Sequence, residues 1–168
     1  MSFEQFGQVM EELSAMCGFP NPLLEDALCD IQVDGINFTL LHSESDDDNL
    51  TSACDFGEVP EAQSAEILRR VLETNMIFFR GDLPRFAINP QTGRVILMAS
   101  IPLENLTADT LVDILKQHAS FAQEWRVTYF LGYESTDAIA MQLAQMEQII
   151  SLDKLDAEAR ALALAAAA

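Results

Sequence analysis

The sequence from residue 28 to residue 42 reads LCDIQVDGINFTLLH. Apolar and polar residues alternate through much of it, and a period of two is typical of a strand with one buried face. Asp34-Gly35 interrupts the stretch with a residue pair that favours a tight primed hairpin turn. The stretch therefore predicts two antiparallel strands, over 28–33 and 36–42.

Further elements are expected on both sides of this hairpin. Apolar residues at helical spacing predict a first helix that ends near Gly18. After the hairpin, we expect an acidic loop from Ser43 to Asn49 and a third strand over 50–56. A second apolar stripe predicts a helix from Glu61 to Thr74.

The second half of the chain predicts another hairpin and more helices. The hairpin would join Phe86–Ile88 to Arg94–Ile101, and Thr107 would cap the following helix. A last helix is expected over about 136–150. The order α-β-β-β-α-β-β-α plus an extra C-terminal helix indicates an α+β fold, a twisted antiparallel sheet with flanking helices. We assign residues 1–131 to one domain and 132–168 to a C-terminal helical extension.

The charge of the chain excludes some partners. Its 168 residues carry 27 Asp and Glu against 9 Lys and Arg, a net charge of −18, although 49% of residues are hydrophobic. Residues 1–68 contain 15 carboxylates and no Lys or Arg. Binding to nucleic acid or to an anionic membrane surface is disfavoured, because both require basic side chains. A negative surface can steer a basic peptide, or it can serve solubility alone.

The sequence has no membrane span, no secretory signal and no cysteine pattern typical of disulfides. No stretch approaches the roughly 20 apolar residues that cross a bilayer. The 3 cysteines have irregular spacing, which favours a reducing compartment. We expect a soluble protein of the cytoplasm, with no insertion into membranes.

No catalytic or metal-binding motif is found, so we expect no enzyme and no cofactor. Phosphate-binding glycine loops and the common hydrolase signatures are missing. The run Asp46–Asp48 fails as a calcium loop because Thr51 and Gly57 stand where Gly and Glu are needed. The cysteines and histidines match no zinc spacing. His118 lies on an apolar helix stripe, which favours a packed, hydrogen-bonded core residue.

Apolar residues around the second helix and in 95–99 exceed the obvious needs of one small sheet. The stretch 95–99 is apolar on both faces, so both faces need a cover. A second copy of the chain can supply that cover across a two-fold axis. We therefore hypothesise a homodimer through this region.

Several stretches, in the same order along the chain, resemble the class I type III secretion chaperones, the Tir-chaperone family. They are residues 28–38, Gly57-Glu58-Val59-Pro60, Leu72-Glu73-Thr74-Asn75, and Phe86 to Leu103 followed by a helix to Trp125. The resemblance covers about residues 1–126, and it rests on the collinearity of these degenerate patterns together with small size and acidity.

The resemblance implies a homodimer in the bacterial cytoplasm that binds a non-globular segment near the N-terminus of a secreted effector. Such proteins keep the effector soluble and present it to the secretion apparatus and its ATPase. They use no nucleotide themselves. The resemblance places these residues at or near the dimer interface: Leu68, Leu72, Phe78, Ile96 and Met98.

Extended peptides bind by strand addition at a sheet edge and by apolar anchors in grooves. The first helix and first two strands could supply both. The candidate effector-binding residues are Phe3, Phe6, Met10, Ile31, Val33, Phe38 and Leu40. Each of them could instead belong to the core between that helix and the sheet, so only a fraction can face an effector.

Two other classes of function remain open. An acidic regulatory interaction protein, such as an anti-activator or a nucleic-acid mimic, would share the charge but need no groove for an extended peptide. A small enzyme would need a pocket with perturbed titratable groups, and no residues in the sequence indicate one.

Overall fold

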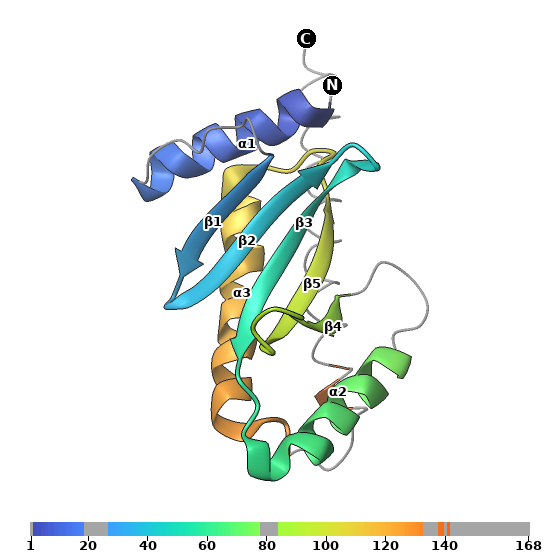
Figure 1. Cartoon of the computed structure of the whole chain (residues 1–168). Coiled ribbons are helices and arrows are strands. Elements are labelled where there is room, and N and C mark those ends of the chain that lie inside the picture. Colours follow the sequence, from blue (N-terminus) through green and yellow to red (C-terminus); the bar gives the residue numbers. More distant parts are fainter. Residues whose placement is uncertain (1, 19–26, 78–83, 133–137, 140, 142–168) are drawn as a thin grey trace.

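The structure is a computed structural model that describes residues 2–18, 27–77, 84–132, 138, 139 and 141. Its helical elements are α1 (Ser2–Cys17), the 3-10 turn η2 (Glu61–Gln63), α2 (Ser64–Ile77) and α3 (Ala108–Thr128). Its strands are β1 (Leu28–Val33), β2 (Ile36–Ser43), β3 (Asp46–Gly57), β4 (Arg85–Ile88) and β5 (Val95–Pro102). Figure 1 shows their arrangement.

The five strands form one antiparallel sheet in the order β1-β2-β3-β5-β4. The predicted α+β class and the order of elements through α3 are confirmed. Of the predicted last helix, residues 138, 139 and 141 are helical, and the rest lies outside the described residues. Ile139 is fully buried and belongs to the core, so the chain returns to the domain after Gly132. The division at 131/132 stays a prediction.

The first hairpin has the predicted turn. Asp34 and Gly35 have φ angles of 50° and 77°, so both occupy the left-handed region that a type I′ turn requires. Glycine adopts this conformation without strain, and aspartate is one of the few other residues that tolerate it. Val33 and Ile36 pair directly across the turn.

The prediction of an acidic loop from Ser43 to Asn49 is wrong. The turn consists of Glu44 and Ser45 alone, and β3 begins at Asp46. Backbone pairing explains the difference, because the Leu103 N–H donates to the Asp48 carbonyl at 2.9 Å. The carboxylates of this stretch stay exposed while the backbone is paired, so their charge does not oppose strand formation.

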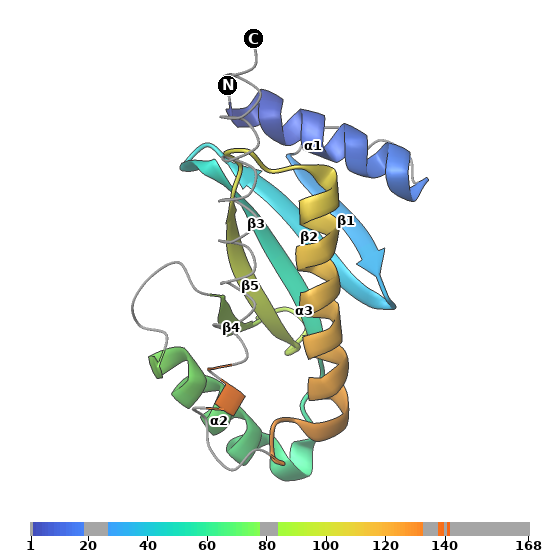
Figure 2. The same cartoon turned by 180° about the vertical axis from the view of Figure 1, so that it is seen from behind.

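Two helices cover one face of the sheet. α3 runs along that face, and α1 crosses it at the end far from α2 (Figure 2). The Thr107 side chain caps α3, as predicted, by accepting the Thr110 N–H at 3.2 Å. Buried alternate residues of the strands meet α3 in the core, and its largest side chain, Trp125, is fully buried.

Phe56, at the end of β3, lies at the centre of an aromatic cluster. Its ring centroid is 5.2 Å from that of Phe86, 5.7 Å from Phe121 and 5.8 Å from Trp125, all at steep interplanar angles. Edge-to-face contacts of this kind stabilise beyond the area they bury. The cluster joins β3, β4 and α3 at the end of the sheet nearest α2.

His118 is a core residue of α3, as predicted, and is 1% exposed. The predicted hydrogen bonding is not seen at its Nε2 atom, which has no hydrogen-bond partner among the described residues. Burial lowers the pKa of His118 to about 4. The folded protein therefore holds the neutral imidazole throughout the physiological range.

We expect the free energy of unfolding to decrease as the pH falls from about 6.5, the pKa of an unfolded histidine, towards about 4. Over this window the unfolded chain binds a proton at His118 that the folded chain rejects. Between about pH 7 and pH 5 the loss should be about 2 kcal/mol. Urea titrations at both pH values measure it. His118→Leu should remove this part of the pH dependence, and an unchanged slope in that variant would contradict the assignment.

Candidate functional site

The second face of the sheet is not covered by any described helix (Figure 1). We call it the open face. Along β2 the burial alternates, so that Phe38 and Leu40 are buried while Leu41 points to the opposite side and is 36% exposed. By strand register, the open face carries Leu28, Asp30, Gln32, Asn37, Thr39, Leu41, Thr51, Ala53, Asp55, Ile96 and Met98. A partner can reach these side chains without disturbing the core.

Strand β1 forms one edge of the described sheet. The residues of β1 that hydrogen-bond to β2 alternate with residues whose N–H and C=O groups point outward. The His42 N–H donates to the Ala27 carbonyl at 2.9 Å. Ala27 therefore faces β2, and so does every second residue after it along β1. Leu28, Asp30 and Gln32 therefore present their backbone groups along the outer edge.

Strand β4 forms the other edge, and its outer side is occupied. The Asn75 side chain of α2 donates from Nδ2 to the Phe86 carbonyl at 2.8 Å, and its Oδ1 accepts the Phe86 N–H at 2.9 Å. Both groups of Phe86 point to the same side of the strand, away from β5. Asn75 thus makes the two hydrogen bonds that a neighbouring strand would make.

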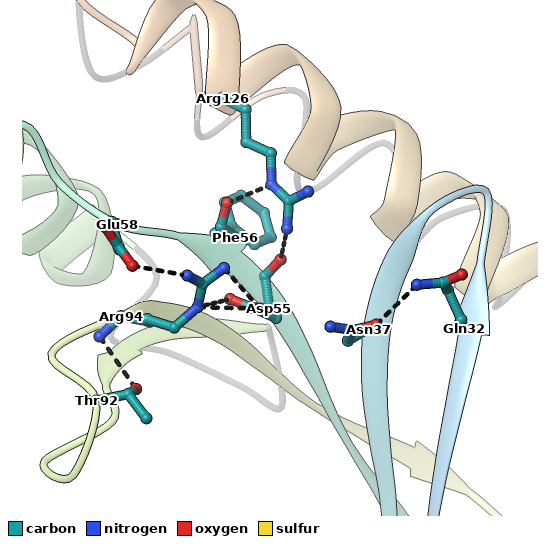
Figure 3. A network of polar contacts seen from close by, with 8 residues as sticks. All are labelled: Gln32, Asn37, Asp55, Phe56, Glu58, Thr92, Arg94 and Arg126. Atoms are coloured by element: carbon teal, nitrogen blue, oxygen red, sulfur yellow. Dashed lines mark hydrogen bonds and ion pairs between the residues drawn. The ribbon is translucent and has the colours of Figure 1, made fainter.

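The open face is hollowed into a depression of about 610 Å³. Its polar lining is tied together by hydrogen bonds, including Thr39 to Asp30 at 2.6 Å and Gln32 to Asn37 at 3.0 Å. At its far side, Arg94 contacts both carboxylate oxygens of Asp55 (Figure 3). The arrangement offers hydrogen-bond partners and charge to a bound partner.

Comparison with known proteins decides the family. The sequence profile of the Tir chaperone protein (CesT) family matches residues 8–126, which is most of the described domain. The chain belongs to the CesT family. Membership confirms the resemblance seen in the sequence and the type III secretion chaperone function predicted from it.

Solved structures share the fold of this CesT-family chain. A chain of the ExsC–ExsE complex matches with a TM-score of 0.62 and 21% identity, over 77% of this chain and 97% of that chain. A chain of the HopA1–SchA chaperone–effector complex matches with a TM-score of 0.58 and 16% identity, over 75% of this chain and 96% of that chain. A chain of the complex between the Yersinia pestis type III secretion chaperone SycH and a stable YscM2 fragment matches with a TM-score of 0.54 and 16% identity. The match covers 71% of this chain and 98% of that chain. No curated protein sequence matches the chain.

The predicted effector-binding residues fall into two groups in this CesT-family fold. The four that are 0–1% exposed, and so belong to the core, are Phe6, Met10, Phe38 and Leu40. They are buried because α1 packs over the covered face of the sheet, so an effector could contact them only if α1 moved. Phe3 is 45% exposed, and Ile31 and Val33 are half-buried. A role for these three in effector binding stays a prediction.

The predicted dimer residues lie mainly at the surface. Leu72 is 67% exposed on α2, Met98 is 39% exposed on the open face, and Leu68 and Ile96 are half-buried. Phe78 lies outside the described residues. In this single chain β5 has one covered and one open face, so the described residues do not supply the cover that was predicted for its second apolar face. The dimer itself stays a prediction.

Sequence reasoning missed several exposed apolar residues. They are Met16, Leu28 and Leu41. Leu40 and Leu41 are consecutive in a strand, so one of them had to face away from the core, and that signal could have identified Leu41. Leu28 pairs directly with Leu41 and lies beside it on the open face.

Cys17 is exposed, whereas Cys29 and Cys54 are buried and poorly suited to act as nucleophiles. Burial raises the pKa of both the Cys29 and Cys54 thiols, and Cys54 donates to the His118 carbonyl at 3.8 Å. Within the described ranges, no three His, Cys, Asp or Glu side chains are grouped to hold a metal ion. Nor does any helix in these ranges have the length and apolar character to cross a membrane.

Proposed function

We propose that this CesT-family chain binds an extended segment near the N-terminus of a secreted effector in the bacterial cytoplasm. It keeps that segment unfolded and soluble, and presents it to the secretion apparatus and its ATPase. It does so without catalysis, cofactor or nucleotide. The observation that carries the proposal is the outward-facing edge of β1 in a chain of this family.

The edge and the open face offer complementary contacts for an extended chain. Backbone groups at Leu28, Asp30 and Gln32 can pair with an added strand, which gives affinity for any sequence. Leu28 and Leu41 lie next to this edge and can contact every second side chain of the added strand. The 15 carboxylates of residues 1–68 favour basic segments and raise their rate of encounter.

Self-association is the second part of the proposal. On α2, Leu68, Leu72 and Met76 follow one another at a spacing of four residues and form a stripe on one side of the helix. An exposed apolar stripe on a helix is typical of an interface. We assign it to a two-fold contact with a second copy.

Co-expression with the effector encoded in the neighbouring reading frame tests the function. Native mass spectrometry should show two copies of this chain with one effector, and limited proteolysis should reveal a protected segment near the effector N-terminus. Capture of a DNA-binding regulator instead would support the acidic regulatory protein. An effector without a protected N-terminal segment would contradict the chaperone proposal.

Strand addition at β1 predicts a position-specific effect of proline. Asp30→Pro should weaken effector binding by about tenfold, because it removes an outward N–H while leaving the backbone hydrogen bonds between β1 and β2 in place. Asp30→Ala is the matched control, since it also loses the contact with Thr39 but keeps the N–H, and it should bind within about threefold of wild type. Isothermal titration with the effector segment measures both. Equal affinities for the two variants would exclude strand addition at this edge.

A further inference from the structure

Among the described residues, α2 is held by its buried side and by polar contacts near its two ends. In Figure 1, α2 lies beyond the end of the sheet, at the opposite end of the molecule from α1. The described elements that it contacts most are η2, from which it continues, and β4. Its buried residues are Ile67, Val71 and Thr74, and its outer side carries Leu72 and Met76, which are 67% and 73% exposed. The buried side anchors α2 to the core, and the polar contacts near its two ends constrain the direction of its axis.

Asn75 makes the polar contact that holds the C-terminal end of α2. It is the residue that closes the outer side of β4 with two hydrogen bonds to the Phe86 backbone. Thr74, beside it, is fully buried and donates to the Arg70 carbonyl within the helix. The amide of Asn75 fits because it supplies one donor and one acceptor from a rigid, planar group. It therefore fixes both the distance and the rotation of α2 relative to β4.

The N-terminal end of α2 is held through the segment that leaves β3. Arg94 of the β4–β5 hairpin contacts both carboxylate oxygens of Asp55 at 2.9–3.1 Å and reaches Glu58 at 3.2 Å (Figure 3). Arg126 of α3 donates to the carbonyls of Phe56 and Asp55 at 2.8 and 2.9 Å. Two guanidinium groups from different elements thus hold the same four-residue segment.

Gly57 lies between these two guanidinium groups and has a φ of 123°, a conformation that other residues rarely adopt. A register shift between Asp55 and Gly57 ends the regular pairing with β5 at this point. The chain changes direction here and continues through Pro60 into η2 and α2. Arg94 and Arg126 therefore hold the segment in which the chain turns from the sheet towards α2, and so they influence the direction of that helix.

We propose that Asn75 and Arg94 are positioning residues that fix the orientation of α2 and so present its apolar stripe to a second copy of the chain. The proposal rests on the self-association inferred above. Neither residue belongs to the stripe, which consists of Leu68, Leu72 and Met76. Their effect on dimerisation is transmitted through the orientation of the helix, because an interface requires all stripe residues to meet their partners at once.

Hydrogen exchange and sedimentation equilibrium on three variants test the proposal. Asn75→Ala and Arg94→Gln should each reduce the protection of α2 amides by about tenfold and weaken the dimer by about tenfold, with α3 and β2 amides unchanged. Arg94→Lys keeps the charge but cannot contact both oxygens of Asp55, so it should behave like Arg94→Gln. Glu73→Gln is the control, since it breaks an exposed ion pair with Arg69 on the same helix and should change neither quantity.

Three results separate the explanations. Unchanged α2 protection in both Asn75→Ala and Arg94→Gln would overturn the positioning role. An equal loss of protection in α2, α3 and β2 would also overturn it, because the residues would then act on global stability. A wild-type chain that is monomeric at all concentrations, with α2 still loosened by Asn75→Ala, would refute self-association while supporting the positioning role.

Discussion

Replacing Leu72 with aspartate is expected to convert the proposed dimer into monomers. Leu72 lies in the middle of the α2 stripe and is 67% exposed in the single chain. Burying a carboxylate against the apolar stripe of a second copy should cost about 3 kcal/mol or more. That corresponds to an increase of about 100-fold in the dimer Kd. Sedimentation equilibrium across a range of protein concentrations measures this change.

A matched control is available on α3. Val127 is also apolar and is 82% exposed, but it lies outside the α2 stripe. Val127→Asp adds the same charge to the surface and should leave the dimer Kd within about twofold, the scale expected of an exposed position. If both variants dimerise as wild type does, α2 is not the interface. The monomeric variant should also bind the effector segment more weakly if both copies contact it.

Phe56→Ala is expected to produce the largest loss of stability. Phe56 is fully buried and contacts three other aromatic rings from β4 and α3. Truncating such a residue removes apolar burial and leaves a cavity, at a cost of about 3–5 kcal/mol. The total free energy of unfolding of a domain of this kind is about 5–15 kcal/mol. Urea unfolding followed by Trp125 fluorescence should show a midpoint shifted strongly to lower denaturant.

Phe3 provides the comparison for this change. It is 45% exposed at the start of α1, with its ring 5.7 Å from that of His42. Phe3→Ala should cost less than about 1 kcal/mol, because little apolar area is removed from the core. A similar loss of stability in the two variants would mean that Phe56 does not anchor the aromatic cluster. Phe3→Ala also tests the predicted role of Phe3 in effector binding, since the side chain is accessible.

Features that depend on a few neighbouring residues could be predicted from the sequence. The Asp34-Gly35 turn follows from the backbone angles that these two residues tolerate. The start of α3 follows from Thr107, whose hydroxyl accepts a backbone N–H three residues later. Both signals are local, so no knowledge of the remaining chain was needed to interpret them.

Features set by distant contacts could not be predicted in this way. The acidic residues before Asn49 look like a loop, yet the backbone there pairs with the chain around Leu103, some fifty positions away. The sequence left Phe38 and Leu40 open to a groove or to the core, and in the fold both are buried beneath α1. Asn75 was no candidate at all, because its partner Phe86 becomes a neighbour only in the fold.

The unequal edges of the sheet limit how chains can aggregate through their strands. If both edges accepted a strand, the β1 of one molecule could join the β4 of the next, and repetition of that contact would build an open-ended filament. Asn75 occupies the outer side of Phe86, at the centre of the short β4 strand. When two molecules pair through their β1 strands, neither has another free edge strand in the described sheet, so the assembly ends at two molecules. The chain is thereby protected from polymerising through its own sheet.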